Sequence, residues 1–240
     1  MKIRTVYDIL NEISPFNMQE EWDNSGLNLG DYNADIKKIY LSVDLDEKLI
    51  DEVDENSLII THHPLIFKSI KKVIPNRFST KLLLKMIKKN ISHIAMHTNF
   101  DKTHLNEYFA KEILGFDGES QDFVFYADVD MEFDELVKYV KEKMNLNSLK
   151  VVKAKEKIKK VAITTGAGMS LLDFVKADCF MTGDIKYHEA MDAKVRGISL
   201  IDITHYHSEK YFSECMERIL KDRIDVEVII RNSDDPFNLI

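Results

Sequence analysis

The same order of predicted elements occurs twice along this chain, and this repeat limits the folds that are open to it. Residues 37–53 predict a strand, a polar turn and a helix, and residues 159–175 predict the same order 122 positions later. A short apolar strand follows each segment, at residues 58–61 and 179–182, and a helix and a final strand come next. Strands that alternate with helices pair largely in parallel. We therefore expect an α/β fold of duplicated strand–helix units with mixed, largely parallel sheets.

A stretch that contains glycine and aspartate, residues 115–120, separates the two halves and reads as a lobe boundary. A chain of 240 residues suits one large domain or two small lobes. We expect a first α/β lobe over residues 1–115 and a second over residues 116–240. The two lobes are expected to intertwine and to share one composite site.

The composition is ordinary for a soluble globular protein, with 45% hydrophobic and 31% charged residues. The longest apolar runs are far shorter than a membrane span, and no signal-peptide core follows residues 1–4. Cys179 and Cys215 lie 36 residues apart in apolar settings, which favours buried thiols over a disulfide. We therefore expect a cytoplasmic protein that does not enter a membrane.

The net charge of −8 argues against general nucleic-acid binding, but the charge is unevenly distributed. Residues 68–89 contain eight lysines or arginines and no acid, and residues 150–160 contain six lysines and one glutamate. Such runs are ordinarily solvated helix and loop faces. The functional alternative is a surface that meets phosphate, either of a nucleotide or of a nucleic-acid strand.

Side chains of the kinds that bind metals follow the predicted strands in both halves. His62 and His63 come directly after one buried strand and Asp101 follows the next, while His205 and Glu209 follow the equivalent strand of the second half. In open α/β sheets, sites form at the carboxyl ends of strands. Residues that are remote in the sequence are therefore expected to meet at one edge.

The spacing of these residues suits two metal ions. Adjacent side chains on a strand point to opposite faces, but at a strand end beside Pro64 the rings of His62 and His63 can diverge toward two neighbouring ions. His205 and Glu209 are four residues apart and share one face of a helical turn. A bridging Glu209 would place two ions about 3.5–4 Å apart. A lone histidine is ordinarily structural, so this prediction depends on the histidines and carboxylates of both halves occurring together.

Five short segments together resemble the NIF-three-like family, whose members are also named GTP cyclohydrolase I type 2 homologues. They span nearly the whole chain in the order of the family. The segments are Trp-Asp-Asn-Ser-Gly-Leu at residues 22–27, Thr-His-His-Pro-Leu at 61–65, His-Thr-Asn-Phe-Asp at 97–101, Thr-Gly-Asp-Ile-Lys-Tyr-His at 182–188 and His-Tyr-His-Ser-Glu at 205–209.

The resemblance implies a duplicated α/β fold, a ring-shaped homohexamer with metal sites that face an internal cavity, and a pair of divalent ions. It also implies hydrolytic activity. The ligands of the family fall on His62, His63, Asp101, His205 and Glu209. This chain departs from the family at Thr204, where glycine commonly precedes the histidine, has His207 at a variable position, and lacks a long insertion between the halves.

The sequence allows more than one role for several residues in or near these motifs. Trp22 either lines the site or packs the first lobe, and Asn24 is the better candidate for contact with a ligand. Gly166-Ala167-Gly168 forms either a plain turn or a set of backbone N–H groups that face a phosphate.

The remaining histidines also have alternatives. His97 either orients the Asp101 loop or stands next to the site. His188 follows a Thr-Gly-Asp turn and is our candidate for substrate contact or proton transfer, with a structural role as the alternative. The side chain of His207 can point either toward the site or away from it. His93 lies inside a buried strand and is expected in the core.

Two functions are consistent with these features. The first is a metal-dependent hydrolase of the GTP cyclohydrolase kind, in which two ions activate water for attack on a nucleotide or another phosphorylated small molecule, with Glu209 and His188 in catalytic roles. The second is a metal-containing oligomeric ring that binds nucleic acid (DNA), or a regulatory protein partner, without catalysis. Three histidines and two carboxylates suit Zn, Fe, Mn, Co or Ni, so the metal stays open.

Overall fold

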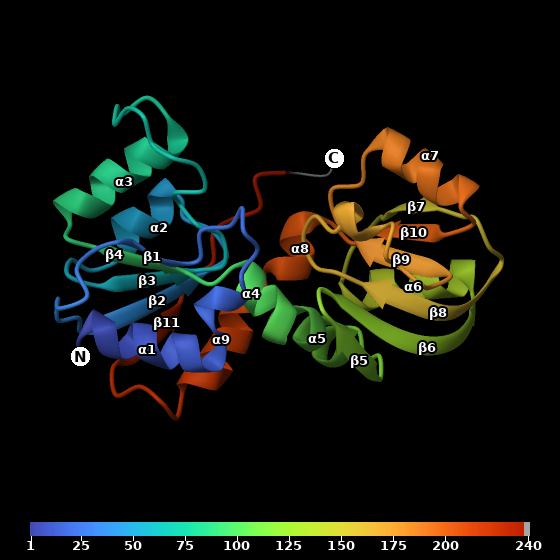
Figure 1. Cartoon of the computed structure of the whole chain (residues 1–240), viewed down its shortest axis with the longest axis horizontal. Coiled ribbons are helices and arrows are strands. Elements are labelled where there is room, and N and C mark those ends of the chain that lie inside the picture. Colours follow the sequence, from blue (N-terminus) through green and yellow to red (C-terminus); the bar gives the residue numbers. More distant parts are fainter. Residues whose placement is uncertain (238–240) are drawn as a thin grey trace. The chain divides into compact units, whose positions relative to one another are not determined.

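The computed structural model describes residues 1–237, and the chain divides into two compact units (Figure 1). Met1–Phe100 and the segment from Phe212 onwards form the first unit, and Asp101–Tyr211 form the second. This division differs from the expected boundary between residues 115 and 116. The chain leaves the first sheet after its fourth strand and returns to it near the C-terminus, where β11 pairs with β2.

A five-stranded sheet with the order β1-β4-β3-β2-β11 forms the centre of the first unit. β11, β2, β3 and β4 pair in parallel, and β1 pairs antiparallel with β4. Every residue of β3 and β4 is buried, as expected for parallel strands that are covered on both faces. The strands are β1 (Gly26–Leu29), β2 (Lys38–Ser42), β3 (Leu58–Thr61), β4 (Ser92–Ala95) and β11 (Glu227–Ile230).

Helices cover both faces of this sheet (Figure 1). α2 and α3 share a hydrophobic cluster with Tyr40 and Ile59, and α1 and α9 lie on the opposite face. α1 buries Ile3, Val6 and Leu10, whose spacing places them on one side of a helix. The helices are α1 (Ile3–Ile13), α2 (Glu47–Glu52), α3 (Phe78–Lys88), α4 (Thr98–Phe100) and α9 (Phe212–Leu220), with a 3-10 turn at Phe16–Met18.

The second unit contains a six-stranded sheet with the order β5-β6-β8-β9-β10-β7. β8, β9 and β10 pair in parallel, while β5, β6 and β7 add antiparallel pairings on both sides of them. Both sheets are therefore mixed, as the sequence predicts. The strands are β5 (Gly118–Gln121), β6 (Val124–Glu132), β7 (Lys150–Val152), β8 (Lys157–Ile163), β9 (Cys179–Thr182) and β10 (Ser199–Asp202).

Two hydrophobic clusters lie on the two faces of the second sheet. Val161 and Met181 share one cluster with α6, and their neighbours Ala162 and Phe180 share the other with α7. This alternation is the period of a strand. The helices are α5 (Asn106–Tyr108), α6 (Phe133–Lys143), α7 (Tyr187–Val195) and α8 (His205–Glu209), with π-helical turns at Asp101–Leu105 and Phe109–Ile113 and a 3-10 turn at Met169–Leu171.

The repeat predicted from the sequence is present in both sheets. β2, β3 and β4 follow one another in parallel in the first unit, and β8, β9 and β10 do so in the second. One element differs from the prediction: the segment after β8 forms only the 3-10 turn at Met169–Leu171, where α2 stands in the first unit. Two glycines in that segment approach neighbouring side chains closely, and glycine disfavours a helix.

Two further expectations concern the membrane and the thiols. No helix within residues 1–237 is both long enough and apolar enough to cross a membrane. Cys179 and Cys215 are buried and neither forms a disulfide, as the sequence predicts. Burial raises the pKa of the Cys179 thiol far above its usual range, which suppresses the reactive thiolate.

Candidate metal centre

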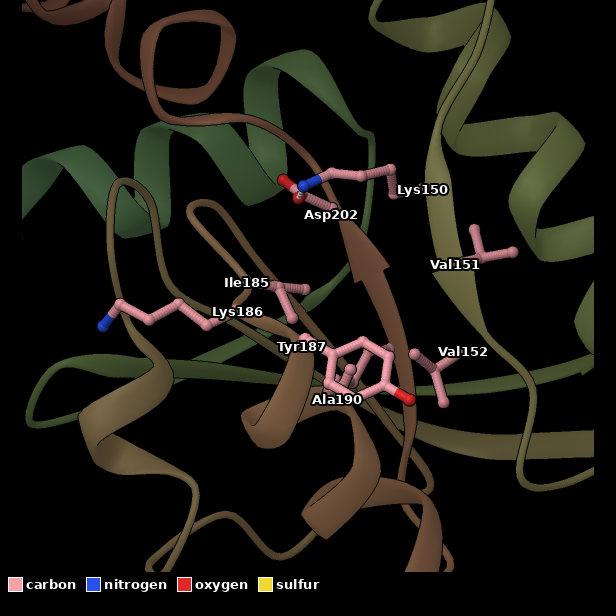
Figure 2. Close-up of a pocket in the computed structure, with 9 residues that line it drawn as sticks. Lys150, Val151, Val152, Ile185, Lys186, Tyr187, Ala190 and Asp202 are labelled. Atoms are coloured by element: carbon pink, nitrogen blue, oxygen red, sulfur yellow. Dashed lines mark ion pairs between the residues drawn. The ribbon is translucent and has the colours of Figure 1, made fainter.

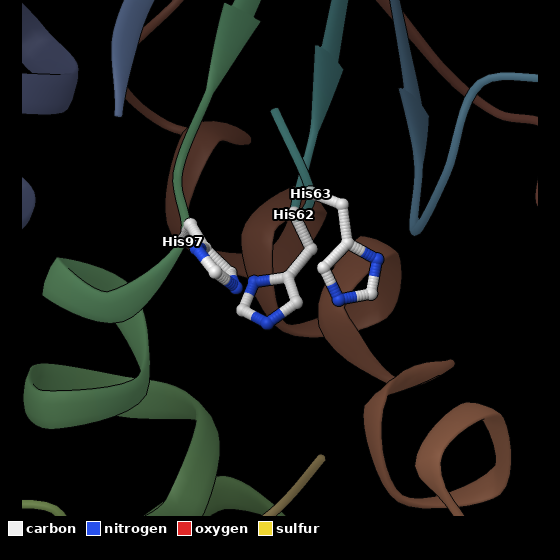
Figure 3. A group of neighbouring side chains, drawn as sticks. All are labelled: His62, His63 and His97. Carbon is white, nitrogen blue, oxygen red and sulfur yellow. The ribbon is translucent and has the colours of Figure 1, made fainter. Parts of the chain in front are cut away.

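Three histidines gather at the carboxyl edge of the first sheet. His62 and His63 follow β3, and His97 follows β4, which is the parallel neighbour of β3. One ring nitrogen from each lies within 4.8 Å of the others. Figure 3 shows the rings side by side, with His62 between the other two. Their centroids are separated by 4.9 Å for His62 and His63, and by 5.1 Å for His62 and His97.

The protonation of these rings follows from their hydrogen bonds. Each ring turns Nδ1 toward an oxygen that can only accept, so Nδ1 must carry the proton. Nε2 is then the ring nitrogen that a metal would bind. The pairs are His62 with the Met96 carbonyl at 2.9 Å, His63 with the Asp44 carboxylate at 2.9 Å and His97 with the Asp23 carboxylate at 2.7 Å.

Asp23 is the most heavily bonded of these acceptors. Its side chain has no exposed surface, and it accepts hydrogen bonds from His97, Ser25 and both the N–H and the hydroxyl of Thr98. Burial opposes ionisation, but hydrogen bonds from His97 and Thr98 outweigh it and hold the pKa of the carboxyl well below its usual range. Asp23 is therefore a carboxylate that fixes the His97 ring in one orientation.

The second unit repeats this arrangement at α8. Nδ1 of His205 lies 2.7 Å from Oδ2 of Asp184, and Nε2 lies 3.1 Å from Oε2 of Glu209. Glu209 is 3% exposed. A carboxylate oxygen of Asp101 comes within 4.8 Å of one from Glu209. Asp101, His205 and Glu209 thus lie together within the second unit, and their nitrogen and oxygen donors suit a divalent ion.

Gly166 makes room for the Glu209 carboxylate. A Cβ at Gly166 would stand 2.0 Å from Oε1 of Glu209, and the residue adopts φ +62°. The Gly166 N–H donates to Ser208 Oγ at 3.0 Å, and the Gly168 N–H donates to Thr182 Oγ1 at 2.7 Å. These N–H groups are engaged within the protein, so the segment is a close-packed turn that supports Glu209.

Thr204 caps α8 in a backbone conformation that glycine ordinarily occupies. Its φ is 58° and its ψ is 152°, a region that is costly for any residue with a Cβ. Its hydroxyl accepts the His207 N–H at 3.3 Å and contacts His207 Nδ1 at 3.0 Å. Glycine adopts this conformation without a steric cost, and the contact places the His207 ring against the cap.

Two other residues singled out from the sequence lie in different settings. The amide of Asn24 donates to the Ile66 carbonyl at 2.6 Å, which ties two loops together. His188 is exposed on α7, where its ring lies 5.3 Å from that of Tyr187. Among residues 1–237, His188 is in none of the groups of side chains that can hold a metal.

Sequence reasoning placed Asp23 and Asp184 in motifs near the site but did not assign any carboxylate to a histidine ring. Asp44 follows the end of β2, and Asp184 follows the end of β9. The rule that polar side chains beyond strand ends build sites applies to both and would have found them. Asp23 precedes β1, where that rule gives no signal.

A separate hollow of about 320 Å³ lies between β7, β10 and α7 (Figure 2). Its walls are mostly apolar, and its one ion pair joins Lys150 to the buried Asp202 at 2.6 Å. Neither residue belongs to the groups that can hold a metal among the described residues. The candidate metal ligands of the second unit therefore lie outside this hollow.

Comparison with known proteins identifies the family. The model of the Duf34/NIF3 family (NGG1p interacting factor 3) matches residues 1–236. The chain belongs to this family. Among curated Duf34/NIF3 relatives, a "GTP cyclohydrolase 1 type 2 homolog" of Campylobacter jejuni is 49% identical over 99% of both chains. A "GTP cyclohydrolase 1 type 2" of Helicobacter pylori is 43% identical, again over 99% of both chains.

Solved structures share the Duf34/NIF3 fold. A Staphylococcus aureus hypothetical protein, SA1388, superposes with a TM-score of 0.89 at 27% identity, over 100% of this chain and 99% of that chain. Reduced HcgD from Methanocaldococcus jannaschii gives a TM-score of 0.82 at 25% identity, over 96% and 97% of the two chains. The mixed α/β architecture expected from the sequence is confirmed.

Proposed function

We propose that this Duf34/NIF3 protein is a metal-dependent hydrolase that acts on a nucleotide or another phosphorylated small molecule. One observation carries the proposal: each histidine of the two clusters has Nδ1 at an acceptor oxygen. All four rings thus share the orientation in which Nε2 is the nitrogen available to a metal. The names of the relatives point to a nucleotide, GTP.

The ligand set that we propose is the one expected from the sequence and the family. These residues would hold two divalent ions per chain, of Zn, Fe, Mn, Co or Ni, and Glu209 would be a ligand of both. Within the first unit the histidines lie close to one another, and within the second unit Asp101, His205 and Glu209 do so. The proposed ligands are His62, His63, Asp101, His205 and Glu209.

Divalent ions bound in this way supply acidified water and polarise the group under attack. The residues of the chain prepare for that chemistry. Asp23, Asp44 and Asp184 lie at Nδ1 of three imidazole rings and orient them so that Nε2 is the nitrogen that could bind a metal. Gly166 leaves space for the Glu209 side chain. His188 is exposed, and we propose that it contacts the substrate or moves a proton.

The experiment that tests this function measures metal content and turnover in the same samples. Purified protein would be analysed for metals and then screened for phosphate and ammonia release from nucleotides. His63→Ala and His205→Ala should each lower the metal content and abolish turnover, and His104→Ala, which removes an imidazole outside the ligand set, should change neither. Wild-type protein that is loaded with metal yet inactive on every nucleotide would refute the hydrolase.

A non-catalytic ring that binds DNA is the second candidate, because Lys68, Lys71, Lys72 and Arg77 are exposed cations. Tight binding of DNA by an inactive protein, with an affinity that falls steeply as salt rises, would favour it. Both candidates share a proposed cytoplasmic location, which rests on the composition and the cysteines, and a proposed homohexamer, which rests on the family resemblance. Light scattering that gives 27.9 kDa, the mass of one chain, would refute the oligomer.

A further inference from the structure

We propose that Trp22 and Phe67 form a stacking platform for the base of a mononucleotide, and that the cations after Phe67 hold its phosphates. This inference rests on the proposed function and names the part of the first unit that binds the substrate. The site would take a planar heteroaromatic ring that carries a phosphate chain.

The two aromatic rings are exposed beside the histidine cluster. Trp22 is 57% exposed and Phe67 is 42% exposed, although aromatic side chains of this size are usually well buried. Their centroids lie 5.7 Å apart, and each lies about 6 Å from the His97 ring, at 6.0 Å for Trp22 and 6.1 Å for Phe67. A ring stacked on this pair would therefore lie next to the candidate metal ligands of the first unit.

Hydrogen bonds fix the two loops that carry the rings. The Asn24 amide donates to the Ile66 carbonyl at 2.6 Å, and the Ile66 N–H donates to the Asn28 side chain at 3.3 Å. These bonds join the loop of Trp22 to the loop of Phe67. On the other side, the His97 N–H donates to Ser25 Oγ at 3.0 Å. The platform is held in place before any ligand arrives, which reduces the entropy lost on binding.

The segment after Phe67 supplies positive charge that the protein itself does not neutralise. Lys68, Lys71, Lys72 and Arg77 are exposed, and within residues 1–237 none of them forms an ion pair. No acid occurs between residues 68 and 89. Farther along the same segment, Lys85 pairs with Asp51 at 2.8 Å. Cations that form no ion pair thus follow Phe67 in the sequence, and a phosphate chain would need such charges.

In the other basic segment, residues 150–160, most lysines are paired with acidic side chains. Lys150, Lys153, Lys155 and Lys157 each form an ion pair with an acidic side chain of the second unit. Their charge is therefore largely compensated, and the segment at residues 150–160 is the weaker candidate for phosphate. The lysines after Phe67 and the adjacent aromatic pair together favour a nucleotide over a purely apolar partner.

The chain allows a direct test, because Trp22 is its only tryptophan. Tryptophan emission would be titrated with GTP, guanosine and tripolyphosphate, in protein as purified and again after treatment with EDTA, with free tryptophan as the reference for absorption by the ligand. Stacking predicts quenching by GTP and guanosine, tighter binding of GTP, and no quenching by tripolyphosphate. Intact quenching without turnover would refute only the hydrolase, whereas unchanged emission with normal turnover would refute only the platform.

Variants can distinguish the binding of the base from the binding of the phosphates. Phe67→Ala should weaken GTP binding about tenfold, since one aromatic stack contributes about that much, and Phe67→Tyr should restore it. Phe174→Ala, which removes an exposed aromatic ring in the second unit, is the matched control and should have no effect. The double variant Lys71→Gln, Lys72→Gln should weaken GTP binding and flatten its salt dependence, and leave guanosine binding unchanged.

Three results would overturn the assignment. Equal quenching by tripolyphosphate would show that the ring does not stack on Trp22. If a single-stranded DNA oligonucleotide binds more tightly than GTP, the surface recognises a nucleic-acid strand and not a mononucleotide. Emission that changes with protein concentration, together with a change in mass by light scattering, would identify the aromatic pair as an interface between copies of the chain.

Discussion

Nδ1 of His97 lies 2.7 Å from Oδ1 of Asp23, a carboxylate whose side chain has no exposed surface. The two residues are 74 positions apart in the sequence. The other oxygen of Asp23 accepts from Ser25 and Thr98, so every group around this carboxylate is a donor. A side chain of the same shape that carries N–H groups would therefore face other donors.

Asp23→Asn tests this relationship. The amide places donors against donors, so we expect a loss of about 1–3 kcal/mol in the free energy of unfolding and a loosened His97 ring. Loss of such a supporting carboxylate typically weakens metal binding about 10- to 100-fold. Chelator competition and urea denaturation measure the two effects. Glu55→Gln, at an exposed acid, is the control, and equal behaviour of the two variants would contradict the role of Asp23.

Gly166→Ala should displace the Glu209 carboxylate, because the new methyl group would stand 2.0 Å from Oε1. Gly197→Ala provides a matched control: Gly197 also has a positive φ, of +75°, but a Cβ there meets nothing within 4 Å. Both variants bear the backbone cost of about 1 kcal/mol for a Cβ at positive φ. Only the Gly166 variant should lose metal as well, measured by elemental analysis. Full metal retention in both would show that the contact does not constrain Glu209.

Thr204→Gly should stabilise the protein. The present φ and ψ of Thr204 cost about 1–3 kcal/mol for a residue with a Cβ, whereas replacement of a capping residue by glycine costs only a few tenths of a kcal/mol. The net gain should be about 1–2 kcal/mol in urea denaturation. Thr204→Ala keeps the strain and loses the hydroxyl, so it should be less stable than the wild type. A glycine variant that is no more stable would mean that the cap outweighs the strain.

The burial of His93 predicts how the free energy of unfolding depends on pH. The residue is fully buried, its ring lies 2.6 Å from Thr61 Oγ1, and burial lowers its pKa from 6.5 to about 3. Between these two values the unfolded chain binds a proton that the folded chain excludes. This contribution to stability is therefore complete above pH 6.5 and falls with acidification, by about 1.4 kcal/mol for each pH unit in that window.

The variant His93→Gln removes this titration and retains a side chain that can hydrogen bond. It should be less stable than the wild type at pH 7, and the difference in the free energy of unfolding should shrink as the pH falls to 4. Denaturant melts of both proteins at several pH values measure the difference. A constant gap would show that folding does not lower the pKa of His93.

Much of the fold was predictable because the evidence for it is local. The apolar runs at residues 58–61 and 179–182 predicted the buried strands β3 and β9, and the alternation of strands with helices predicted parallel pairing. The prediction failed after β8, where glycines replace a helix with a 3-10 turn. The glycines lower the helix propensity of this segment, and Gly166 in addition leaves room for the Glu209 carboxylate, a contact over a long stretch of sequence that local patterns do not report.

The histidines and carboxylates were recognisable from the sequence because their types and spacing are those of metal ligands. The sequence by itself determined the order of the strands along the chain, and with it the positions just beyond strand ends where His62, His97 and His205 stand. Only the tertiary structure decided which oxygen meets each ring. Hydrogen bonds such as that between Asp23 and His97 join residues far apart in the chain, so their geometry depends on the packing of whole strands and loops and leaves no periodic signal in the sequence.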